Sequence, residues 1–443
     1  MRIQLSDHFT YSRLLRFVFP SIVMMVFTSI YSVVDGLFVS NFVGKTAFAA
    51  VNLIMPVLMA FGTLGFLVGT GGSAVVSMAL GEGKRETANR YFSMLVYAAA
   101  GAGLILTVIG LVAMRPISKA LGAEGQMLED CVLYGRILIS FIAMFILQNL
   151  FQSFFVAAEK PKLGLLITVA AGLTNMVLDA LFVAVFQWGI VGAAAATVIS
   201  QTVGGIIPIF YFAGKNDSLL HLTKARLEWK VLLRVCINGS SELMTNLSAS
   251  VVNILYNFQL MKLAGENGVA AYGVIMYVNF IFAAVYFGYA IGSAPIISYQ
   301  YGAARTGELK NLFRKSLLIT GMFGICMLIS SELLASPLAS WFVGYDQELF
   351  ELTRRGFQIY ALSFCISGFN VFSSAFFTAL NNGIISASIS FLRTLLFQMA
   401  AILILPAILG IDGVWMAISA AELLALAVSI LFFVTQRKRY HYA

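Results

Sequence analysis

Charged side chains inside long apolar runs are the residues of this chain with the clearest capacity for chemistry. Five meet that description: Asp35, Asp179, Glu242, Arg393 and Glu422. A charge at the centre of a bilayer costs about 2.5–3.5 kcal/mol on insertion scales, so such residues usually persist for a function. Burial disfavours the charged form of a carboxylate, which favours the binding of a proton or a cation. The acidic residues therefore predict reversible cation binding.

Asp35 and Asp179 are the first candidates for such a site. Tyr31 lies one helical turn before Asp35, and Asn175 lies one turn before Asp179, so each aspartate shares a face with a second polar residue. We expect the two aspartates to meet as one site for Na⁺ or H⁺. The alternative is that they only make a hydrogen bond between helices.

Glu242 begins a polar stripe that we expect to line a substrate cavity. At 100° per residue, the stripe stays within about 60° around a helix. A face of this kind must border water or another polar surface. Glu242 would then neutralise a cationic substrate or form a second ion site, although a polar contact between helices would give the same pattern. The residues assigned to this cavity are Tyr31, Gln148, Asn149, Gln152, Glu242, Asn246, Asn253, Asn257 and Asn370.

The remaining intramembrane charges have a simpler interpretation. Arg393 and Glu422 lie in the last two apolar runs, and we expect them to neutralise each other. The four cysteines are isolated and the three histidines lie in polar segments, so the sequence shows no cysteine or histidine metal site.

The elements that position these residues are predicted to be transmembrane helices. The chain has 443 residues, of which 60% are hydrophobic and 11% charged, whereas a soluble domain carries roughly a quarter charged residues. Apolar runs of 18 residues or more indicate spanning helices. We expect twelve, at 15–40, 47–79, 91–114, 132–157, 163–186, 190–212, 231–261, 268–299, 313–333, 355–380, 384–409 and 413–434.

The distribution of basic residues predicts the orientation in the membrane. With the N-terminus in the cytoplasm, 20 of the 28 Lys and Arg fall in inside segments and 7 in outside segments. This bias is typical of a bacterial inner-membrane protein with both termini in the cytoplasm. It also accounts for the net charge of +8 without a nucleic-acid partner.

The two halves of the chain repeat each other. A shift of 221 residues superposes Ser77 on Ser298 and Gly81 on Gly302, and it also superposes the Gly-Ile pair at 189–190 on the pair at 410–411. Six spans in each half give both halves the same orientation, so a pseudo-two-fold axis along the membrane normal is expected. The predicted domains are an N-lobe (1–212), a cytoplasmic inter-lobe loop (213–230) and a C-lobe (231–443).

Motifs for other classes of function are missing from the sequence. There is no GxxxxGK[ST] loop, and the longest loop is too short for a nucleotide-binding domain, so no nucleotide is expected. There is no HExxH and no GxSxG, so the chain is not predicted to be an enzyme. No obligatory protein partner is indicated.

Several stretches together resemble the multidrug and toxic compound extrusion (MATE) family, close to its DinF-like bacterial exporters. The resemblance covers essentially the whole chain. It includes YSVVDGLFV at 31–39, GGSA at 71–74, EKPK at 159–162, NMVLD at 175–179 and GSAPIISYQYGA at 292–303.

The resemblance implies export of small cationic aromatic compounds in exchange for Na⁺ or H⁺, without a cofactor. It implies a cation site in the N-lobe, at Asp35, Asn175, Asp179 and Thr197, and a bending point at Pro20. Asn370 stands where some relatives carry an aspartate, which shifts the expected ion site towards the N-lobe. The alternative function is a flippase for lipid-linked precursors, from the same broader superfamily.

Overall fold

The computed structural model describes residues 3–442, which form helices joined by short connections and contain no β-strand. The first half comprises α1 (Tyr11–Phe38), η1 (Val39–Val43), α2 (Lys45–Gly81), α3 (Arg85–Ala120), α4 (Gly125–Ser140), α5 (Ile142–Ala157), α6 (Pro161–Asp179), η2 (Ala180–Val185) and α7 (Gly189–Ala213). The second half comprises α8 (Trp229–Gly302), α9 (Thr306–Val343), α10 (Gln347–Ala361), α11 (Phe364–Ala379), α12 (Gly383–Phe391), η3 (Leu392–Phe397), α13 (Gln398–Leu409) and α14 (Ile411–Tyr440). The η segments are single π-helical stretches.

These helices supply the twelve predicted spans. Within residues 3–442, nine helices or continuous helical segments are long and apolar enough to cross a membrane, and the bent pairs α4–α5 and α10–α11 add two. The 74-residue α8 is interrupted at Gly265, which adopts φ 59° and ψ −145°. Only glycine readily adopts that backbone conformation. The break divides α8 into two spans, so the count agrees with the prediction from hydropathy.

The helices extend further than the apolar runs that revealed them. The run predicted at 91–114 lies inside α3, which has 36 residues. At 1.5 Å per residue, α3 is about 54 Å long, against roughly 30 Å of hydrocarbon. Its ends therefore project beyond the bilayer core, where hydropathy no longer marks them.

The backbone repeats with the same offset as the sequence. Left-handed glycines occur at Gly44 and Gly265, with φ 115° and 59°, and again at Gly189 and Gly410, with φ 62° and 60°. Both pairs are separated by 221 residues. The bends between α4 and α5 and between α10 and α11 recur at that offset too. The repeat is therefore one of structure and not only of residue type.

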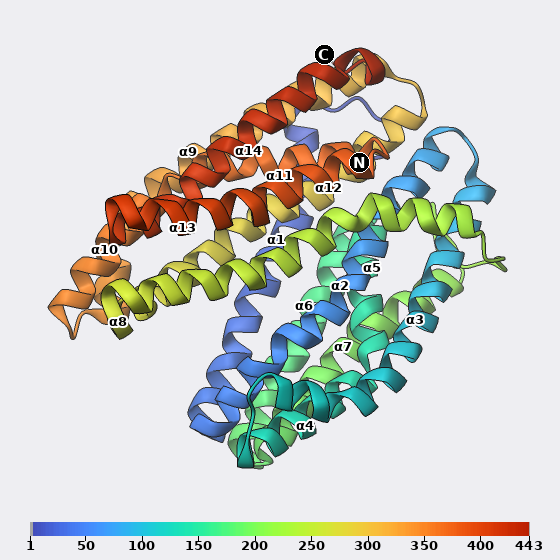
Figure 1. Cartoon of the computed structure of the whole chain (residues 1–443). Helices are drawn as coiled ribbons and strands as arrows, with labels where there is room; N and C mark the ends of the chain where they lie inside the picture. Colours follow the sequence, from blue (N-terminus) through green and yellow to red (C-terminus); the bar gives the residue numbers. More distant parts are fainter. Residues whose placement is uncertain (1–2, 443) are drawn as a thin grey trace.

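The two halves of the chain form two groups of helices. Figure 1 shows α2–α7 with the later part of α1 (blue to green) in one group and α9–α14 (yellow to red) in another; the first half of the long α8 follows the border between them, and its second half lies with α9–α14. Tyr440, near the C-terminus, accepts a hydrogen bond at its hydroxyl from Asn382 Nδ2 (2.9 Å), and Phe9 N donates to Glu308 Oε1 (2.9 Å). Both termini therefore lie at the same end of the molecule, which is called the terminal end below.

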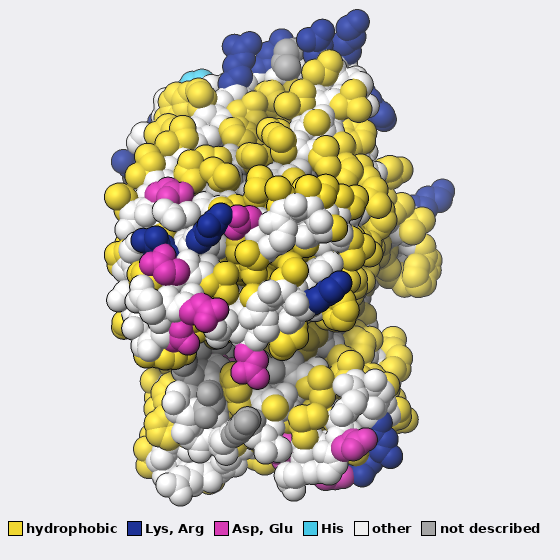
Figure 2. Space-filling view, turned by 60° about the vertical axis from the view of Figure 1, so that its left-hand side comes forward, with side chains coloured by type: hydrophobic (Ala, Val, Ile, Leu, Met, Phe, Trp, Pro, Cys, Tyr) yellow, Lys and Arg dark blue, Asp and Glu magenta, His cyan; other side chains and the backbone are white. Residues whose placement is uncertain are grey.

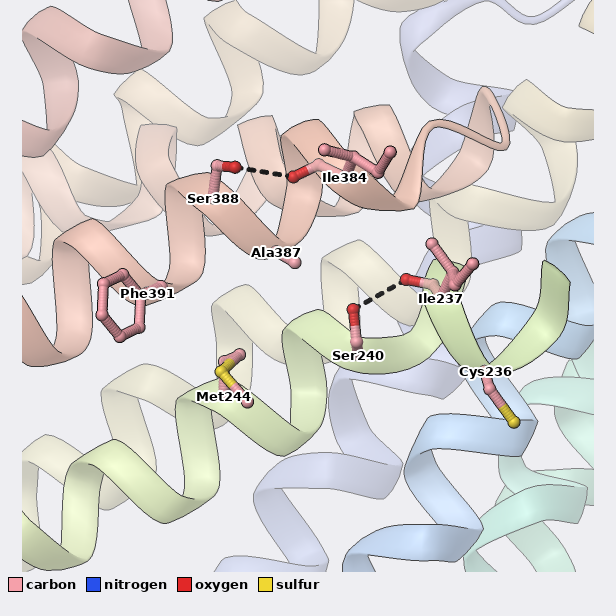
Figure 3. A pocket seen from close by; sticks show the side chains of 8 residues that line it. All are labelled: Cys236, Ile237, Ser240, Met244, Ile384, Ala387, Ser388 and Phe391. Carbon is pink, nitrogen blue, oxygen red and sulfur yellow. Dashed lines mark hydrogen bonds between the residues drawn. The ribbon is translucent and has the colours of Figure 1, made fainter. Parts of the chain in front are cut away.

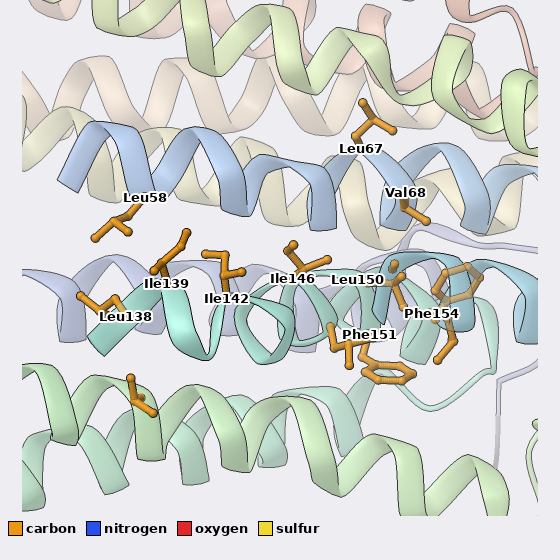
Figure 4. Packing of buried hydrophobic residues seen from close by; sticks show 14 of the residues in the cluster. Leu58, Leu67, Val68, Leu138, Ile139, Ile142, Ile146, Leu150, Phe151 and Phe154 are labelled. Atoms are coloured by element: carbon orange, nitrogen blue, oxygen red, sulfur yellow. The ribbon is translucent and has the colours of Figure 1, made fainter. Parts of the chain in front are cut away.

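Aliphatic and aromatic packing gives the first group its core. Figure 4 shows Leu58 and Val68 of α2 facing the side chains of α4 and α5, among them Ile146 and Phe154, whereas Leu67 points to the opposite side of α2. These residues are at most 7% exposed. α5 is buried along nearly its whole length, so it forms the centre of this group.

Many large apolar side chains instead point outward. On α3, Leu104, Val108 and Val112 are 64%, 67% and 76% exposed. Figure 2 shows hydrophobic side chains spread over much of one face, with Lys and Arg gathered at one end of it. A surface so apolar suits lipid as the surrounding solvent.

A close contact between α2 and α8 joins the two groups at the terminal end. A Cβ on Gly81 would lie 2.1 Å from Tyr299 O, and a Cβ on Gly302 would lie 2.2 Å from Met78 O. Gly81 and Gly302 are equivalent in the repeat, and so are Met78 and Tyr299. The contact is therefore self-complementary about the pseudo-two-fold axis.

A second pair of contacts obeys the same symmetry deeper in the molecule. A Cβ on Gly71 would lie 2.7 Å from Gly239 N, and a Cβ on Gly292 would lie 2.6 Å from Val18 Cγ1. The 221-residue shift relates Gly71 to Gly292 and Val18 to Gly239. We call these two pairs of contacts the glycine seal, because the missing side chains of the glycines let the helices of both groups approach closely.

The segment before α1 also connects the two groups at the terminal end. Leu5 N donates to Glu159 Oε1 (2.7 Å) in the first group, and Gln300 Nε2 in α8 donates to Leu5 O (2.7 Å). Glu308 of α9 accepts from Phe9 N, and the side chains of Leu5 and Phe9 are fully buried. We call residues 3–10 the N-terminal strap.

Candidate functional site

Asp35 and Asp179 approach each other in the first group. Asp35 lies near the end of α1, and Asp179 is the last residue of α6. The two carboxylates and the Asn175 side chain are close enough to act on one another electrostatically. Gly172 makes this approach possible, because a Cβ there would lie 2.5 Å from Phe27 and 2.9 Å from Tyr31 of α1.

The polar atoms of this cluster have few partners within the protein. Both carboxylate oxygens of Asp179, Oδ1 of Asp35 and both amide atoms of Asn175 are buried without a hydrogen bond among the described residues. Asp179 is completely buried and Asn175 is 2% exposed. Buried polar groups normally have partners, so unpaired oxygens gathered in one place fit a cation or proton that binds there.

Both aspartates adjoin π-helical backbone. η1 begins four residues after Asp35, and η2 begins at the residue that follows Asp179. π-helical segments are rare and are frequent at functional sites, where they reposition side chains and backbone carbonyls. The site is therefore built where two spans leave regular α-helical geometry.

Tyr134 of α4 and Thr197 of α7 complete the surroundings of the aspartates. Tyr134 is fully buried, interacts electrostatically with Asp35 and Asp179, and lies next to Thr197. The Thr197 hydroxyl donates to Ala193 O (3.0 Å), whereas the Tyr134 hydroxyl has no partner among the described residues. Sequence reasoning did not select Tyr134, because a single tyrosine in an apolar run is ordinary core material.

A cavity of about 130 Å³ separates the two groups of helices farther along α1. Met25 of α1, ten residues before Asp35, is one of its lining residues, and Glu242 is its single charged one. The lining combines apolar and hydroxyl side chains from both halves: Met25, Phe66, Thr70, Ser73, Ser153, Glu242, Thr245, Asn246, Phe287, Ala290, Ile291, Ala294, Ala375 and Thr378. Because α1 carries residues of both the cavity and the aspartate cluster, the two places share one helix about 15 Å apart along its axis.

Only part of the predicted substrate set lines this cavity. Glu242 and Asn246 do, and Asn253 continues their stripe along α8 as an exposed side chain. The half-buried Asn257 donates to Asn253 O (3.0 Å). Tyr31 instead lies beside Asp35 and near Gln148.

The polar residues of α5 face the interior of the first group. Gln148 and Gln152 border a small void shared with α6 and α7, away from the cavity between the groups. Asn149 is 4% exposed and its Nδ2 has no partner among the described residues. Sequence periodicity identified this polar face of the helix, but it could not show which neighbour the face meets.

Asn370 belongs to a buried network in the second group. Its Nδ2 donates to Glu422 Oε2 (2.7 Å), and Arg393 Nη2 lies 2.7 Å from Glu422 Oε1. The expectation that Arg393 and Glu422 neutralise each other is thus confirmed.

Pro20 lies inside the continuous helix α1, at the level where that helix meets α8. A Cβ on Gly288 of α8 would lie 2.8 Å from the backbone oxygen of Ser21, the residue after Pro20. Proline removes one helical hydrogen bond at this point and permits bending.

An apolar groove of about 510 Å³ lies between α8 and α12 (Figure 3). Its lining residues are Cys236, Ile237, Ser240, Met244, Ile384, Ala387, Ser388 and Phe391. Figure 3 shows that Ser240 and Ser388 donate within their own helices, to Ile237 O (2.7 Å) and Ile384 O (2.8 Å). Among the residues that the structure describes, no charged side chain lines the groove, so those residues supply no carboxylate for ion binding.

Comparisons with known proteins agree with this architecture. The family model described as MatE matches residues 20–181 and 243–403, one match in each half of the chain. The multidrug export protein MepA of Staphylococcus aureus (strain MSSA476) is 21% identical over 425 residues, or 96% of this chain and 93% of that protein. MepA of Staphylococcus saprophyticus is 23% identical over 71% of this chain and 70% of its own length.

Solved structures give the same result for the fold. A crystal structure of MATE in complex with MaL6 has a TM-score of 0.93 and 22% identity, and the match covers 98% of both chains. An outward-facing multidrug resistance MATE family transporter of the MOP superfamily has a TM-score of 0.92 and 22% identity, again with 98% of both chains. The family matches cover more than half of the chain, which therefore belongs to the MATE family of multi-pass membrane transporters and is not an enzyme.

Proposed function

We propose that the protein exports small cationic lipophilic or aromatic compounds in exchange for H⁺ or Na⁺, by alternating access. It would act in the bacterial cytoplasmic membrane with both termini inside, as an N-lobe (1–212) and a C-lobe (231–443) joined by the loop 213–230. We place it near the DinF-like branch of the family on the motifs of its spans. The MepA relatives, described as multidrug export proteins, support export as the activity.

The observation that carries the proposal is the set of unpaired buried oxygens around Asp35 and Asp179. Two facing carboxylates repel each other when both are charged, and a proton or Na⁺ between them relieves that repulsion. If the ion binds from one side of the membrane and is released to the other, each transport cycle is coupled to the movement of that ion down its gradient. Each elementary charge moved yields about 2.3 kcal/mol per 100 mV of membrane potential.

The charge of the cavity supports a cationic substrate. Glu242 is the one charged residue of the lining, and the remainder is apolar or carries hydroxyl and amide groups. A flippase for pyrophosphate-bearing lipids would need basic side chains around the phosphates, and the cavity lining contains neither Lys nor Arg. The drug-export alternative is therefore the better supported of the two.

The path from ion to substrate would follow α1. This helix carries Asp35 at one end, Met25 on the cavity and Pro20 near the glycine seal. Ion binding between Asp35 and Asp179 would draw α1 towards α6, with Pro20 as the bending point. That movement changes the cavity wall on which the substrate rests.

Ethidium efflux from a pump-deficient bacterial host tests the proposal. The protein and its Asp179→Asn variant would be compared under an imposed Na⁺ gradient and then an imposed pH gradient. We expect efflux to follow one of the two gradients and to fall at least about tenfold in the variant, since the asparagine cannot release a proton or carry the negative charge. The gradient that drives efflux identifies the coupling ion.

Glu124→Gln is the matched control, because this carboxylate is exposed and lies outside the cluster. The control should leave efflux unchanged. Folded protein that moves no ethidium under either gradient, or an Asp179→Asn variant with full gradient-driven efflux, would contradict the proposed exchange.

A further inference from the structure

The buried carboxylates of the two lobes differ in their hydrogen-bond partners. In the N-lobe, both oxygens of Asp179 lack a partner among the described residues. In the C-lobe, Glu422 is 1% exposed, and Arg393 Nε contacts its Oε1 at 2.8 Å and its Oε2 at 2.9 Å. Asn370 Nδ2 adds a contact of 2.7 Å to Oε2, and Ser429 Oγ donates to Asn370 Oδ1 (3.0 Å). The C-lobe carboxylate is thus fully occupied by donors of the protein itself.

The repeat relates residues of this network to positions in the N-lobe, although Glu422 itself does not correspond to either aspartate. The 221-residue shift relates Asn370 to Asn149, whose Nδ2 is buried and unpaired among the described residues. It relates Arg393 to Gly172, the glycine against which Phe27 and Tyr31 pack beside the aspartates. At this position the N-lobe has a glycine covered by the rings of Phe27 and Tyr31, whereas the C-lobe has a guanidinium group.

A π-helical stretch lies next to the buried carboxylates in both lobes. η2 follows Asp179 directly, and η3 contains Arg393, so each acidic site adjoins a π-helical stretch in the equivalent pair of spans. The side chain of Arg393 is 14% exposed, which keeps it mostly out of water. A guanidinium is always protonated in proteins, so this positive charge can neither leave nor be titrated away.

We propose that Arg393 serves as a permanently attached counter-cation in the C-lobe. It takes the position at Glu422 that a coupling ion takes at Asp35 and Asp179, and Glu422 therefore binds no ion during transport. Arg393 would limit ion exchange to the N-lobe and so set how many ions accompany each substrate. This inference rests on the proposed N-lobe ion site, and it makes Arg393 a positioning residue for Glu422.

The inference predicts how Glu422 behaves once the guanidinium group of Arg393 is removed. A buried carboxylate that loses its cationic partner is strongly unfavourable when charged. Glu422 should then recruit Na⁺ or a proton from solution. A pair that only fastens helices together would lose stability on the same substitution but would gain no ion dependence.

The test measures the melting temperature of purified protein in detergent as Na⁺ is titrated against choline, at neutral and at mildly acidic pH. An Asp179→Asn background removes the N-lobe response. We expect no ion response in that background, and a saturable rise of the melting temperature with Na⁺ or with acidification once Arg393→Gln is added. The glutamine keeps a hydrogen-bond donor for Glu422 while removing the charge.

Two further variants make the assignment specific. Glu422→Gln added to Arg393→Gln should abolish the acquired response, because no carboxylate remains. Arg393→Ala should be stabilised by added guanidinium ion at concentrations that leave the Asp179→Asn background unaffected, and guanidinium also permits its purification should it unfold without it.

Two outcomes would overturn the proposal. One is an Arg393→Gln variant that is folded but shows no ion response. The other is an Asp179→Asn background that already responds to ions and loses the response with Glu422→Gln. Because the readout is stability and not efflux, a protein that fails the ethidium experiment remains testable here, so failure of the exchange function and failure of this inference are distinguishable.

Discussion

Tyr134 extends the aspartate cluster to a third helix. Tyr134 belongs to α4 and its ring is fully buried. Its hydroxyl group interacts electrostatically with both carboxylates and has no hydrogen-bond partner among the described residues. A phenolic hydroxyl can donate to a carboxylate or offer an oxygen to Na⁺. Tyr134 is therefore positioned to adjust how tightly the coupling ion is held.

Replacement of Tyr134 by phenylalanine removes only the hydroxyl. A single hydrogen bond contributes about 0.5–1.5 kcal/mol, so we expect the ion concentration for half-maximal efflux to change by about twofold to tenfold. Ethidium efflux titrated with the driving ion measures this. Tyr256→Phe is the control, because Tyr256 is equally buried with an unpaired hydroxyl but lies in the C-lobe. Equal effects of the two substitutions would argue against a special role for Tyr134.

The acidic residues could be predicted from the sequence, but the neighbours that complete their site could not, and each result has a physical reason. A charge in lipid is costly, so Asp35, Asp179 and Glu422 stand out from the apolar runs that contain them. Tyr134 and Gly172 carry no such signal, because a tyrosine or a glycine in a span is common. The burial of Gln148 and Gln152 within one lobe depends on how α5 is rotated against α6 and α7, which hydropathy does not encode.

At the scale of helices, breaks in the backbone are as informative as the spans. Length and hydropathy predicted twelve spans, and the structure provides them, but as bent or interrupted elements in several cases. The break at Gly265 lies between the spans predicted at 231–261 and 268–299, so hydropathy located it, although not its backbone conformation. The π-helical stretches η1, η2 and η3 were not predicted from the sequence.

Gly265 offers a direct test of the break within α8. Its conformation is open to glycine alone, and a Cβ there would meet no atom within 4 Å, so an alanine would be penalised by backbone strain and not by collision. We expect Gly265→Ala to reduce the free energy of unfolding by about 1–3 kcal/mol, seen as a lower melting temperature.

The control for that substitution is Gly273→Ala in the helical part of α8. Its Cβ would also meet nothing within 4 Å, and its backbone is helical. Alanine is favoured over glycine there by up to about 1 kcal/mol, so this variant should be neutral or stabilised. If both variants lost a similar amount of stability, the backbone conformation of Gly265 would not be the reason why a glycine is needed there.

At the scale of the whole molecule, the glycine seal fixes which end of the inter-lobe space is closed. Gly71 meets the backbone of α8 at Gly239 and Val235, with no side chain between them. A transporter that alternates its access must separate these surfaces once in every cycle. The seal is close enough that even a small side chain would hold it apart.

Gly71→Val should therefore shift the population towards a state open at the terminal end. A Cβ at Gly71 would lie 2.4 Å from Val235 O, and backbone atoms on both sides leave little room to adjust. We expect faster labelling of a Ser77→Cys variant by a water-soluble thiol reagent, because Ser77 is fully buried between the two pairs of contacts of the seal. The measurement needs a background in which the four native cysteines are replaced.

Gly101→Val on α3 is the matched control, because its Cβ would meet no atom within 4 Å. It should leave the labelling rate unchanged. A labelling rate that Gly71→Val does not raise, in folded protein, would show that the lobes accommodate the side chain without parting.

The N-terminal strap has a consequence for how the molecule is made. Phe9 finds its partner on Glu308, 299 residues later in the chain, and Leu5 joins Glu159 to Gln300. Synthesis runs from the N-terminus, so residues 3–10 leave the ribosome before the second group of helices and wait until that group has been inserted into the bilayer. Residues 3–10 thus reach their native contacts late, and the terminal end can close only after α8 and α9 have been made.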